Sequence, residues 1–361
     1  MKIFIIISKL LLLELRFPVN CQENWALEEL NRFLIDSKQS QFGGLSGIII
    51  SNSGLNFTIL SDKGDYFEGE LIRTNNGDIS NLKIRSSGHL LSSNGLPLKD
   101  KNVDSESIVK DSNNTFFISF ESNNRIMSHK TLNSPGKFLP KHKDFKGLNY
   151  NKGLEALALN EDGDLFAIPE KPPDGYLKYP IYKLVDEDWI IFSTFNPERN
   201  FHISDAAFLS NTELLVLERS FNWSLGFILR IRLLTFKKNE IIKDHILTET
   251  TSGAYNHEGL AIWKNDIDEI MLTLISDNNF LPFLKSEIRE YKLVEIWSHG
   301  EFYDVILNVV VNGKELFREE AGAWSNRTRH EPLNELGKDG WELIRIIQDL
   351  PREFLYFKRD L

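Results

Sequence analysis

The sequence predicts an all-β protein, a β-propeller of five or six blades followed by a small α+β module. From Gly43 to about Leu293, short apolar runs alternate with clusters of Asn, Asp, Gly and Ser, which is the pattern of many short strands joined by turns. Five hairpins begin at residues 46, 106, 155, 205 and 258, which are 60, 49, 50 and 53 residues apart. A period near 50 residues with about four strands per unit is typical of propeller blades. A sixth blade would have to lie in the long first interval, or be formed by N-terminal sequence that pairs with the last unit.

The first 21 residues resemble a signal peptide, with an early Lys2, an apolar stretch, and Val19 and Cys21 at the −3 and −1 positions of a cleavage site. We therefore expect export to the periplasm or the extracellular space, and a cytoplasmic protein if this segment is not a signal peptide. Charged residues interrupt the segment, so it is too broken for a membrane-spanning helix, and no other stretch could span a bilayer. Cys21 is the single cysteine, which excludes intrachain disulfides.

Residues 22–41 lead into the propeller, and their pattern does not decide between a short amphipathic helix over 24–36 and the approach to a first strand. The propeller is expected over residues 42–295. Residues 296–361 form the α+β module, with a hairpin around Asn312-Gly313, a helix ending near Gly337, and two closing strands.

The composition restricts the partners. A hydrophobic content of 41% is enough for a sizeable core, and the net charge of −10 argues against nucleic acids and anionic lipid surfaces, because both would repel the chain. The expected partner is a small phosphate ester or another ligand that the sequence does not identify.

Acidic residues lie at equal distances on the two sides of each hairpin turn, so folding brings them side by side at the open end of the hairpin. Repetition around an axis would gather these ends at one mouth of the propeller. The candidate metal ligands are Asp62, Glu106, Glu121, Glu155, Glu170, Asp205, Glu218, Glu258 and Asp277, with Ser46 at the corresponding position of the first hairpin. Grouped carboxylates need a cation or arginines nearby, and Ca²⁺ suits them because it takes 6–8 oxygen ligands in flexible geometry. The alternative is that several of these acids cap turns or pair with bases that join the blades.

Three bases adjoin mouth acids and are candidates for phosphate binding: Lys63, Lys171 and Arg219. Neighbouring strand residues point to opposite faces, so only bases at strand ends could turn toward the mouth. His257 beside Glu258 could transfer protons near pH 7, and the catalytic candidates are Glu155, Glu258 and His257.

Covalent hydrolysis is poorly supported by the sequence. Ser46 lies in GGLSGI, which lacks the G-x-S-x-G spacing of a nucleophile elbow, and Cys21 lies in the leader. Metal-activated water is then the remaining route to phosphate-ester cleavage.

Several strings, in this order and at these spacings, carry a family resemblance: GGLSGI…LSDKG, DSESI, NKGLEALAL, ISDAAFL…LLVLERSF and EGLAI…LISDNNF. Over about residues 42–293 the chain resembles the phytase-like β-propeller family, whose bacterial members are often labelled "esterase-like activity of phytase". The resemblance implies an exported propeller with calcium-dependent chemistry on phosphate esters. The chain departs from the family pattern at Ser107, where glycine is usual, which could narrow the approach beside Glu106. Residues 301–361 resemble a small bacterial domain of unknown function through LNELGKDGWELIRI and the closing FLYFKRDL.

The leading hypothesis is a calcium-dependent hydrolase of phosphate esters that uses the acidic mouth. The alternative is a non-catalytic, calcium-stabilised propeller that binds a ligand or a partner protein there, and a carboxylic-ester hydrolase is less favoured for want of a nucleophile.

Overall fold

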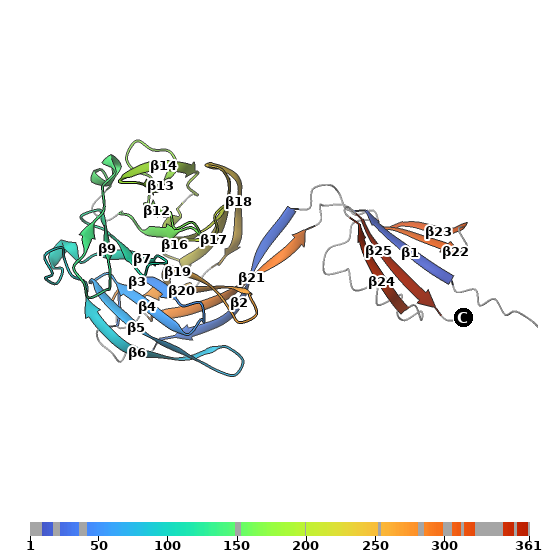
Figure 1. The fold of residues 1–361 in the computed structure, drawn as a ribbon, viewed down its shortest axis with the longest axis horizontal. Coiled ribbons are helices and arrows are strands. Elements are labelled where there is room, and N and C mark those ends of the chain that lie inside the picture. The colour runs from blue at the N-terminus through green and yellow to red at the C-terminus, as the bar shows by residue number, and fades with distance from the viewer. Residues whose placement is uncertain are drawn as a thin grey trace, which may run out of the picture. The chain divides into compact units, whose positions relative to one another are not determined.

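A computed structural model of the chain describes residues 9–16, 22–35, 42–148, 153–198, 200–251, 254–280, 285–298, 305–311, 314–321, 342–349 and 352–359. They belong to two compact units: Ala26–Val294, and Met1–Trp25 together with Glu295–Leu361. The first unit contains five four-stranded sheets (Figure 1), so the propeller prediction is confirmed and the blade count is five.

In each blade, the strands follow one another in chain order from the innermost to the outermost. The exception is the outermost strand of blade 5, which comes from the N-terminal part of the chain. Blade 1 consists of β3 (Leu45–Ile50), β4 (Asn56–Ser61), β5 (Asp65–Arg73) and β6 (Ile79–His89). Blade 2 consists of β7 (Ser105–Lys110), β8 (Phe116–Phe120), β9 (Arg125–His129) and β10 (Lys137–Phe138). Blade 3 consists of β11 (Ala156–Leu159), β12 (Leu165–Ile168), β13 (Tyr179–Val185) and β14 (Asp188–Phe195). Blade 4 consists of β15 (His202–Ser210), β16 (Glu213–Asn222), β17 (Gly226–Lys237) and β18 (Glu240–Glu249). Blade 5 consists of β19 (Asn256–Lys264), β20 (Ile270–Asp277), β21 (Glu287–Ser298) and β2 (Gln22–Leu34).

The N-terminal strand closes the ring. β2 is the outermost strand of blade 5, so the lead-in segment forms a strand and not a helix, and N-terminal sequence completes the last unit without adding a sixth blade. The inner strands β3, β7, β11, β15 and β19 contact one another in sequence, and β19 contacts β3 again. The two short 3₁₀ turns of the described residues are η1 (Asp100–Asn102) and η2 (Lys143–Lys146).

The cores lie between neighbouring blades, because each sheet is covered on both faces. One cluster joins blades 1 and 5 through side chains such as Ile48, Phe57 and Trp263, and another joins blades 3 and 4 through side chains such as Phe166 and Leu234. The blade strands are accordingly apolar at many consecutive positions. Fixed packing on both faces holds the strand ends in place, and these ends form the mouth.

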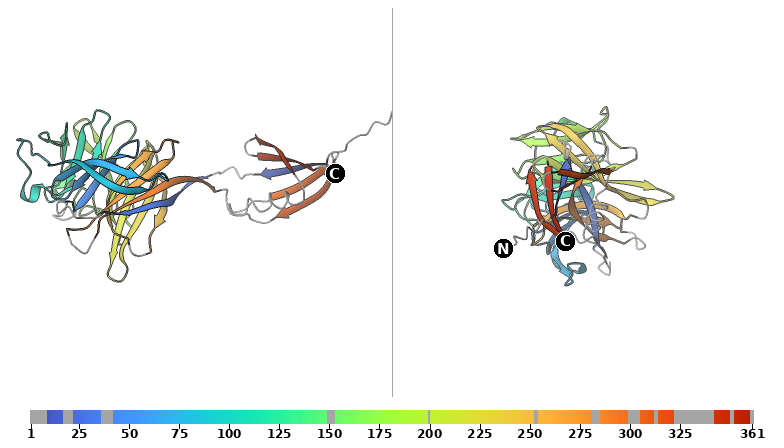
Figure 2. Two further views of the ribbon diagram at one scale, coloured as in Figure 1. Left: turned by 90° about the horizontal axis from the view of Figure 1, so that it is seen from below. Right: turned by 90° about the vertical axis from the view of Figure 1, so that its right-hand side faces the viewer.

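The second unit contains a five-stranded sheet in the order β23-β22-β1-β25-β24, drawn from another side in Figure 2. Its strands are β1 (Lys9–Arg16), β22 (Val305–Val311), β23 (Lys314–Ala321), β24 (Glu342–Asp349) and β25 (Arg352–Arg359). β22 and β23 pair antiparallel, as the predicted hairpin requires. The helix expected to end near Gly337 lies outside the described residues. Part of the predicted signal peptide forms β1, and cleavage after residue 21 stays a prediction. Within the described part of the chain, no helix has the length and apolar character needed to cross a membrane.

Candidate metal site at the propeller mouth

The mouth begins at a bulge that recurs in the inner strands. The register shifts between Leu45 and Gly47, Ser105 and Ile108, Ile203 and Asp205, and His257 and Gly259. A bulge leaves an extra residue outside the ladder and turns its side chain in a new direction. The residues released in this way are Ser46, Glu106 with Ser107, Ser204 and Glu258, and Glu155 occupies the same place just before β11.

The second strand of each hairpin supplies a second ring of mouth residues. Counted from the strand pairing, the equivalent positions are Asp62, Glu121, Glu170, Arg219 and Asp277. Blades 1, 2, 3 and 5 therefore place an acid at this position, whereas blade 4 places an arginine. Together with Glu106, Glu155 and Glu258, seven of the nine predicted carboxylates reach the mouth.

Asp205 and Glu218, which were also predicted as metal ligands, do not belong to these rings. The bulge in β15 falls on Ser204, so Asp205 is equivalent to Gly47 and Gly259, one residue further along the strand. Glu218 pairs with Ile203 before the bulge and is equivalent to Ser61 and Ser276, so Arg219 takes the mouth position. A one-residue displacement on a strand turns a side chain to the other face.

Three carboxylates of blade 2 form a close acidic group among the described residues. Asp104, Glu106 and Glu121 each present an oxygen, and these atoms lie within 4.8 Å of one another. Ser122 Oγ donates to Asp104 Oδ2 at 2.7 Å, and the Gly153 amide donates to Glu121 Oε1 at 3.1 Å, which fixes two of the three groups. Sequence reasoning missed Asp104, although its position two residues before Glu106 in DSES placed it within reach.

The electrostatics of this group favour a bound cation. Burial raises the pKa of Glu106 well above its usual value, and the charges of Glu155, Glu121 and Asp104 raise it further. Burial, with the Asp104 charge beside it, raises the pKa of Glu121 to about 7. The pKa of Glu155 is also raised well above the usual range, mainly by burial. These carboxyls either hold protons or share a positive ion at neutral pH.

The donor set fits calcium. It consists of carboxylate oxygens, and a neutral oxygen lies beside it: the buried Asn124 Oδ1 has no hydrogen-bond partner among the described residues. A Cβ placed on Gly153 would lie 2.5 Å from Asn124 Oδ1 and 2.9 Å from Glu121 Cγ, so both side chains flank this glycine. Hard oxygen ligands of mixed charge are those that Ca²⁺ binds.

Arg219 acts on several of the mouth carboxylates. Its charge lowers the pKa of Glu106, Glu121, Glu155 and Asp277 against the larger effect of burial. Its Nη1 donates to Asn256 Oδ1 at 2.7 Å and also to Glu258 Oε1, and Asn256 Nδ2 donates to the same Glu258 oxygen at 2.7 Å. Glu258 is thereby occupied as the partner of Arg219.

The other predicted bases lie differently. Lys63 is largely exposed, with Nζ 3.4 Å from Asp62 Oδ1 and 5.3 Å from the centre of the Phe280 ring. Burial raises the pKa of Asp62 to about 6. Lys171 is partly buried beside Glu170. Lys63 is thus a rim residue of the mouth, where a ligand could reach it.

His257 is fully buried inside blade 5. Nδ1 lies 3.0 Å from the Tyr255 carbonyl oxygen, and Nε2 lies 3.1 Å from Glu287 Oε1, which also accepts from Arg289 Nε at 2.8 Å. Burial lowers the pKa of His257. Both ring nitrogens are occupied, so the contacts of His257 favour a structural role over proton transfer at the mouth.

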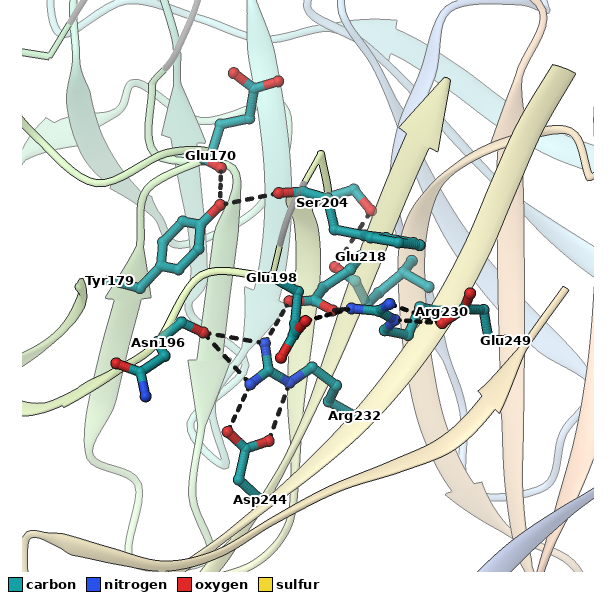
Figure 3. Close-up of polar contacts among 12 residues, drawn as sticks. Glu170, Tyr179, Asn196, Glu198, Ser204, Glu218, Arg230, Arg232, Asp244 and Glu249 are labelled. Atoms are coloured by element: carbon teal, nitrogen blue, oxygen red, sulfur yellow. Dashed lines mark hydrogen bonds and ion pairs between the residues drawn. The ribbon is translucent and has the colours of Figure 1, made fainter. Parts of the chain in front are cut away.

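Glu218 lies in a separate ionic network of blade 4 (Figure 3). Arg232 Nη1 donates to Glu218 Oε1 at 2.8 Å, and Arg230 Nη1 lies 3.5 Å from Glu218 Oε2. Arg232 also binds Asp244 at 2.5 Å, and Arg230 binds Glu249 at 2.7 Å. Arginines thus occupy both Glu218 oxygens.

Asp205 joins the inner strands near the axis. Its Oδ1 accepts from Ser107 Oγ at 3.0 Å, and its Oδ2 accepts from the Leu260 amide at 2.7 Å. Ser107 Oγ in turn accepts from the Leu157 amide at 3.1 Å, so one chain of bonds connects blades 2, 3, 4 and 5. Ser107 is buried in this network, and Asp205, Leu157 and Leu260 also line a cavity of about 180 Å³ between the five inner strands.

Replacing Asp205 by Ala should destabilise the fold by about 2–3 kcal/mol, because the buried Leu260 amide and Ser107 hydroxyl would lose their partner. Urea unfolding followed by tryptophan fluorescence measures this effect. Asp205→Asn, which keeps one acceptor oxygen, should lose less. Equal stability of the Ala variant and the parent would contradict the proposed role of Asp205.

The raised pKa values predict how the chelator-stripped protein responds to pH. A carboxyl with a folded pKa above its unfolded value binds more protons in the folded state, so its stabilising effect is present below about pH 4.5 and is lost as the pH rises through the folded value. Glu121, at about 7, and Asp62, at about 6, should make the stripped protein melt at a lower temperature at pH 7.5 than at pH 5. Calorimetric Tm values with chelator test this. A Tm that rises from pH 5 to pH 7.5 would contradict it.

The propeller residues match a known family. A family model described as "Phytase-like: Esterase-like activity of phytase" matches residues 40–280. No curated protein matches the chain. Among solved structures, the PQQ-bound aldose sugar dehydrogenase from Streptomyces coelicolor is 10% identical with a TM-score of 0.43, and the match covers 76% of this chain and 100% of that one. Virginiamycin B lyase from Staphylococcus aureus is 11% identical with a TM-score of 0.35, covering 75% of this chain and 100% of that one. A protein of unknown function from Dyadobacter fermentans is 9% identical with a TM-score of 0.41, and here 75% of this chain and 100% of that one are covered.

Proposed function

The chain belongs to the phytase-like family, whose description is "Esterase-like activity of phytase". We propose that it hydrolyses phosphate esters at the mouth with the help of a bound calcium ion. The observation that carries this proposal is the carboxylate group of Asp104, Glu106 and Glu121, whose oxygens lie within 4.8 Å of one another. With Asn124 Oδ1 beside it, this group offers the ligand chemistry that a calcium ion needs. When bound, calcium supplies positive charge to phosphate oxygens and lowers the pKa of a nearby water.

Arg219 binds and orients the phosphate in this proposal. Its guanidinium is held by Asn256 and Glu258, so it is fixed before the substrate arrives. A fixed guanidinium matches the geometry of phosphate oxygens and loses little side-chain entropy on binding. The neutral Asn256 and a single carboxylate hold Arg219 in place.

Glu155 is the proposed proton acceptor. Among the described residues its carboxylate has no hydrogen-bond or ion-pair partner, in contrast to Glu258 and His257, the other two candidates. Its raised pKa makes it a stronger base than an exposed glutamate. Glu155 would take a proton from the attacking water and hold it at a carboxylate oxygen.

The test uses the full chain, stripped with chelator and assayed for phosphate release from phytate and from phenyl phosphate, with and without added Ca²⁺. Release that requires Ca²⁺ and is abolished in Glu155→Gln supports the proposal. Ca²⁺ that raises the Tm while neither ester is cleaved would overturn the hydrolase assignment in favour of a calcium-stabilised binding propeller.

A further inference from the structure

The hairpin of β16 and β17 carries an exposed aromatic tip next to the mouth. Phe221 is 52% exposed, Trp223 is 95% exposed and Leu225 is 46% exposed. The Phe221 and Trp223 rings meet edge-on with centroids 5.2 Å apart, and Phe221 packs on Phe227 at 5.0 Å. The rings therefore form one cluster, which we call the aromatic tip.

The strand register places the aromatic tip beside Arg219. β16 pairs with β17 without a register shift from Glu213 to Asn222, so Arg219 and Phe221 lie on the same face. Two residues of a strand span about 7 Å, which is about the size of one aromatic ring. The same strand thus presents a phosphate-binding guanidinium and, one ring further out, an apolar surface.

The two sides of the mouth differ in character. Blades 2 and 3 contribute Glu106, Glu121, Glu155 and Glu170, whereas blade 4 contributes Arg219 and the aromatic tip. Exposed aromatic rings grouped beside a polar site are typical of ligand-binding surfaces, because they supply a large apolar area at low entropic cost. A highly charged ester without an apolar face would leave this area unused.

We propose that the mouth selects phosphate esters whose alcohol part carries a flat apolar ring, and that this ring packs against Trp223 and Phe221. This inference rests on the proposed function, because it takes the phosphate to lie between Arg219 and the carboxylate group. The ligand class is an aryl phosphate. The aromatic tip determines specificity, and the carboxylates provide the chemistry.

The kinetic test compares phenyl phosphate with glycerol 2-phosphate in the parent, Trp223→Ala and Trp223→Phe, all with Ca²⁺. Trp223→Ala should lower kcat/KM for phenyl phosphate about 3- to 10-fold, chiefly through KM, and leave kcat/KM for glycerol 2-phosphate unchanged. Trp223→Phe should retain most of the preference. Phe138→Ala, which removes another exposed ring, serves as the matched control and should change neither value. Equal losses for both esters, or no loss for either, would overturn the inference.

A binding test separates this inference from the proposed function. Phenylphosphonate and methylphosphonate, which are not hydrolysed, are titrated calorimetrically into the calcium-loaded parent and Trp223→Ala. If the parent binds phenylphosphonate more tightly than methylphosphonate and Trp223→Ala does not, the ring site is supported even if no ester is cleaved. Hydrolysis of esters without any preference for phenylphosphonate would remove the ring site and leave the hydrolase. A parent that is dimeric in light scattering while Trp223→Ala is monomeric would show that a second copy covers the aromatic tip, and would overturn the proposal.

Discussion

Replacement of Glu106 by Gln is expected to lower kcat/KM for phosphate-ester hydrolysis by about 100-fold or more, and calcium affinity by about 10- to 100-fold. Glu106 is one of the three carboxylates whose oxygens lie within 4.8 Å of one another, and glutamine keeps its size while removing its charge. Loss of one charged ligand weakens a calcium site built from few carboxylates, and losses of this size follow when even a supporting partner of a metal ligand is removed. Steady-state kinetics and calcium titration measure the two effects.

The stability of Glu106→Gln should not fall along with its activity. Burial and the neighbouring charges of Glu155 and Glu121 oppose ionisation of Glu106, so its removal should leave the chelator-stripped protein equally or more stable at pH 7.5. This sign separates a functional loss from misfolding. Glu240→Gln, which removes an exposed carboxylate at the start of β18, is the matched control and should change neither activity nor calcium affinity. A Glu106→Gln variant with the parent's activity would contradict the assignment.

Replacement of Arg232 by Met should destabilise the protein by about 3–5 kcal/mol. Arg232 is almost fully buried and binds the buried Glu218 at 2.8 Å and Asp244 at 2.5 Å, so its removal leaves buried negative charge without its main partner. Its Nη1 also lies 3.3 Å from the Asn196 carbonyl oxygen of blade 3, so a contact between blades is lost as well. Urea unfolding at pH 7.5 gives the free energy directly.

Two variants sharpen this result. Arg85→Met breaks the pair with Glu70 on the exposed face of blade 1 and should cost less than about 1 kcal/mol, because solvent screens exposed pairs. Adding Glu218→Leu to Arg232→Met should recover much of the lost stability, since the double variant no longer buries the Glu218 carboxylate without Arg232. If Arg232→Met were no more costly than Arg85→Met, the network would not stabilise the fold.

The propeller could be predicted because its signals are local. Hairpins at a spacing near 50 residues, with acids at equal distances from each turn, predict both the blades and the pairing of Glu155 with Glu170 at one end. Pairing of N-terminal sequence with the last unit was one open alternative, and the sequence could not decide it because β2 and β21 are more than 250 residues apart. The local pattern of β2 allowed either a helix or a strand.

Two of the predicted mouth residues are displaced by one position. Asp205 and Glu218 are equally distant from their turn, but so are Ser204 and Arg219, and the strand pairing makes Ser204 and Arg219 equivalent to the mouth residues of the other blades. Symmetry about the turn therefore does not determine how far along the hairpin the mouth lies. His257 illustrates a different limit, because its burial against Glu287 depends on a strand far along the chain.

The most direct test of the calcium proposal is a calorimetric titration of Ca²⁺ into the chelator-stripped protein at pH 7, repeated in two buffers with different heats of ionisation. We expect at least one ion to bind and to release protons, because the pKa of Glu121 is about 7 and those of Glu106 and Glu155 are raised well above their usual values. Binding should weaken in Glu106→Gln and persist in Glu240→Gln. Absence of calcium binding by the parent, or binding that Glu106→Gln leaves unchanged, would contradict a metal site at the mouth.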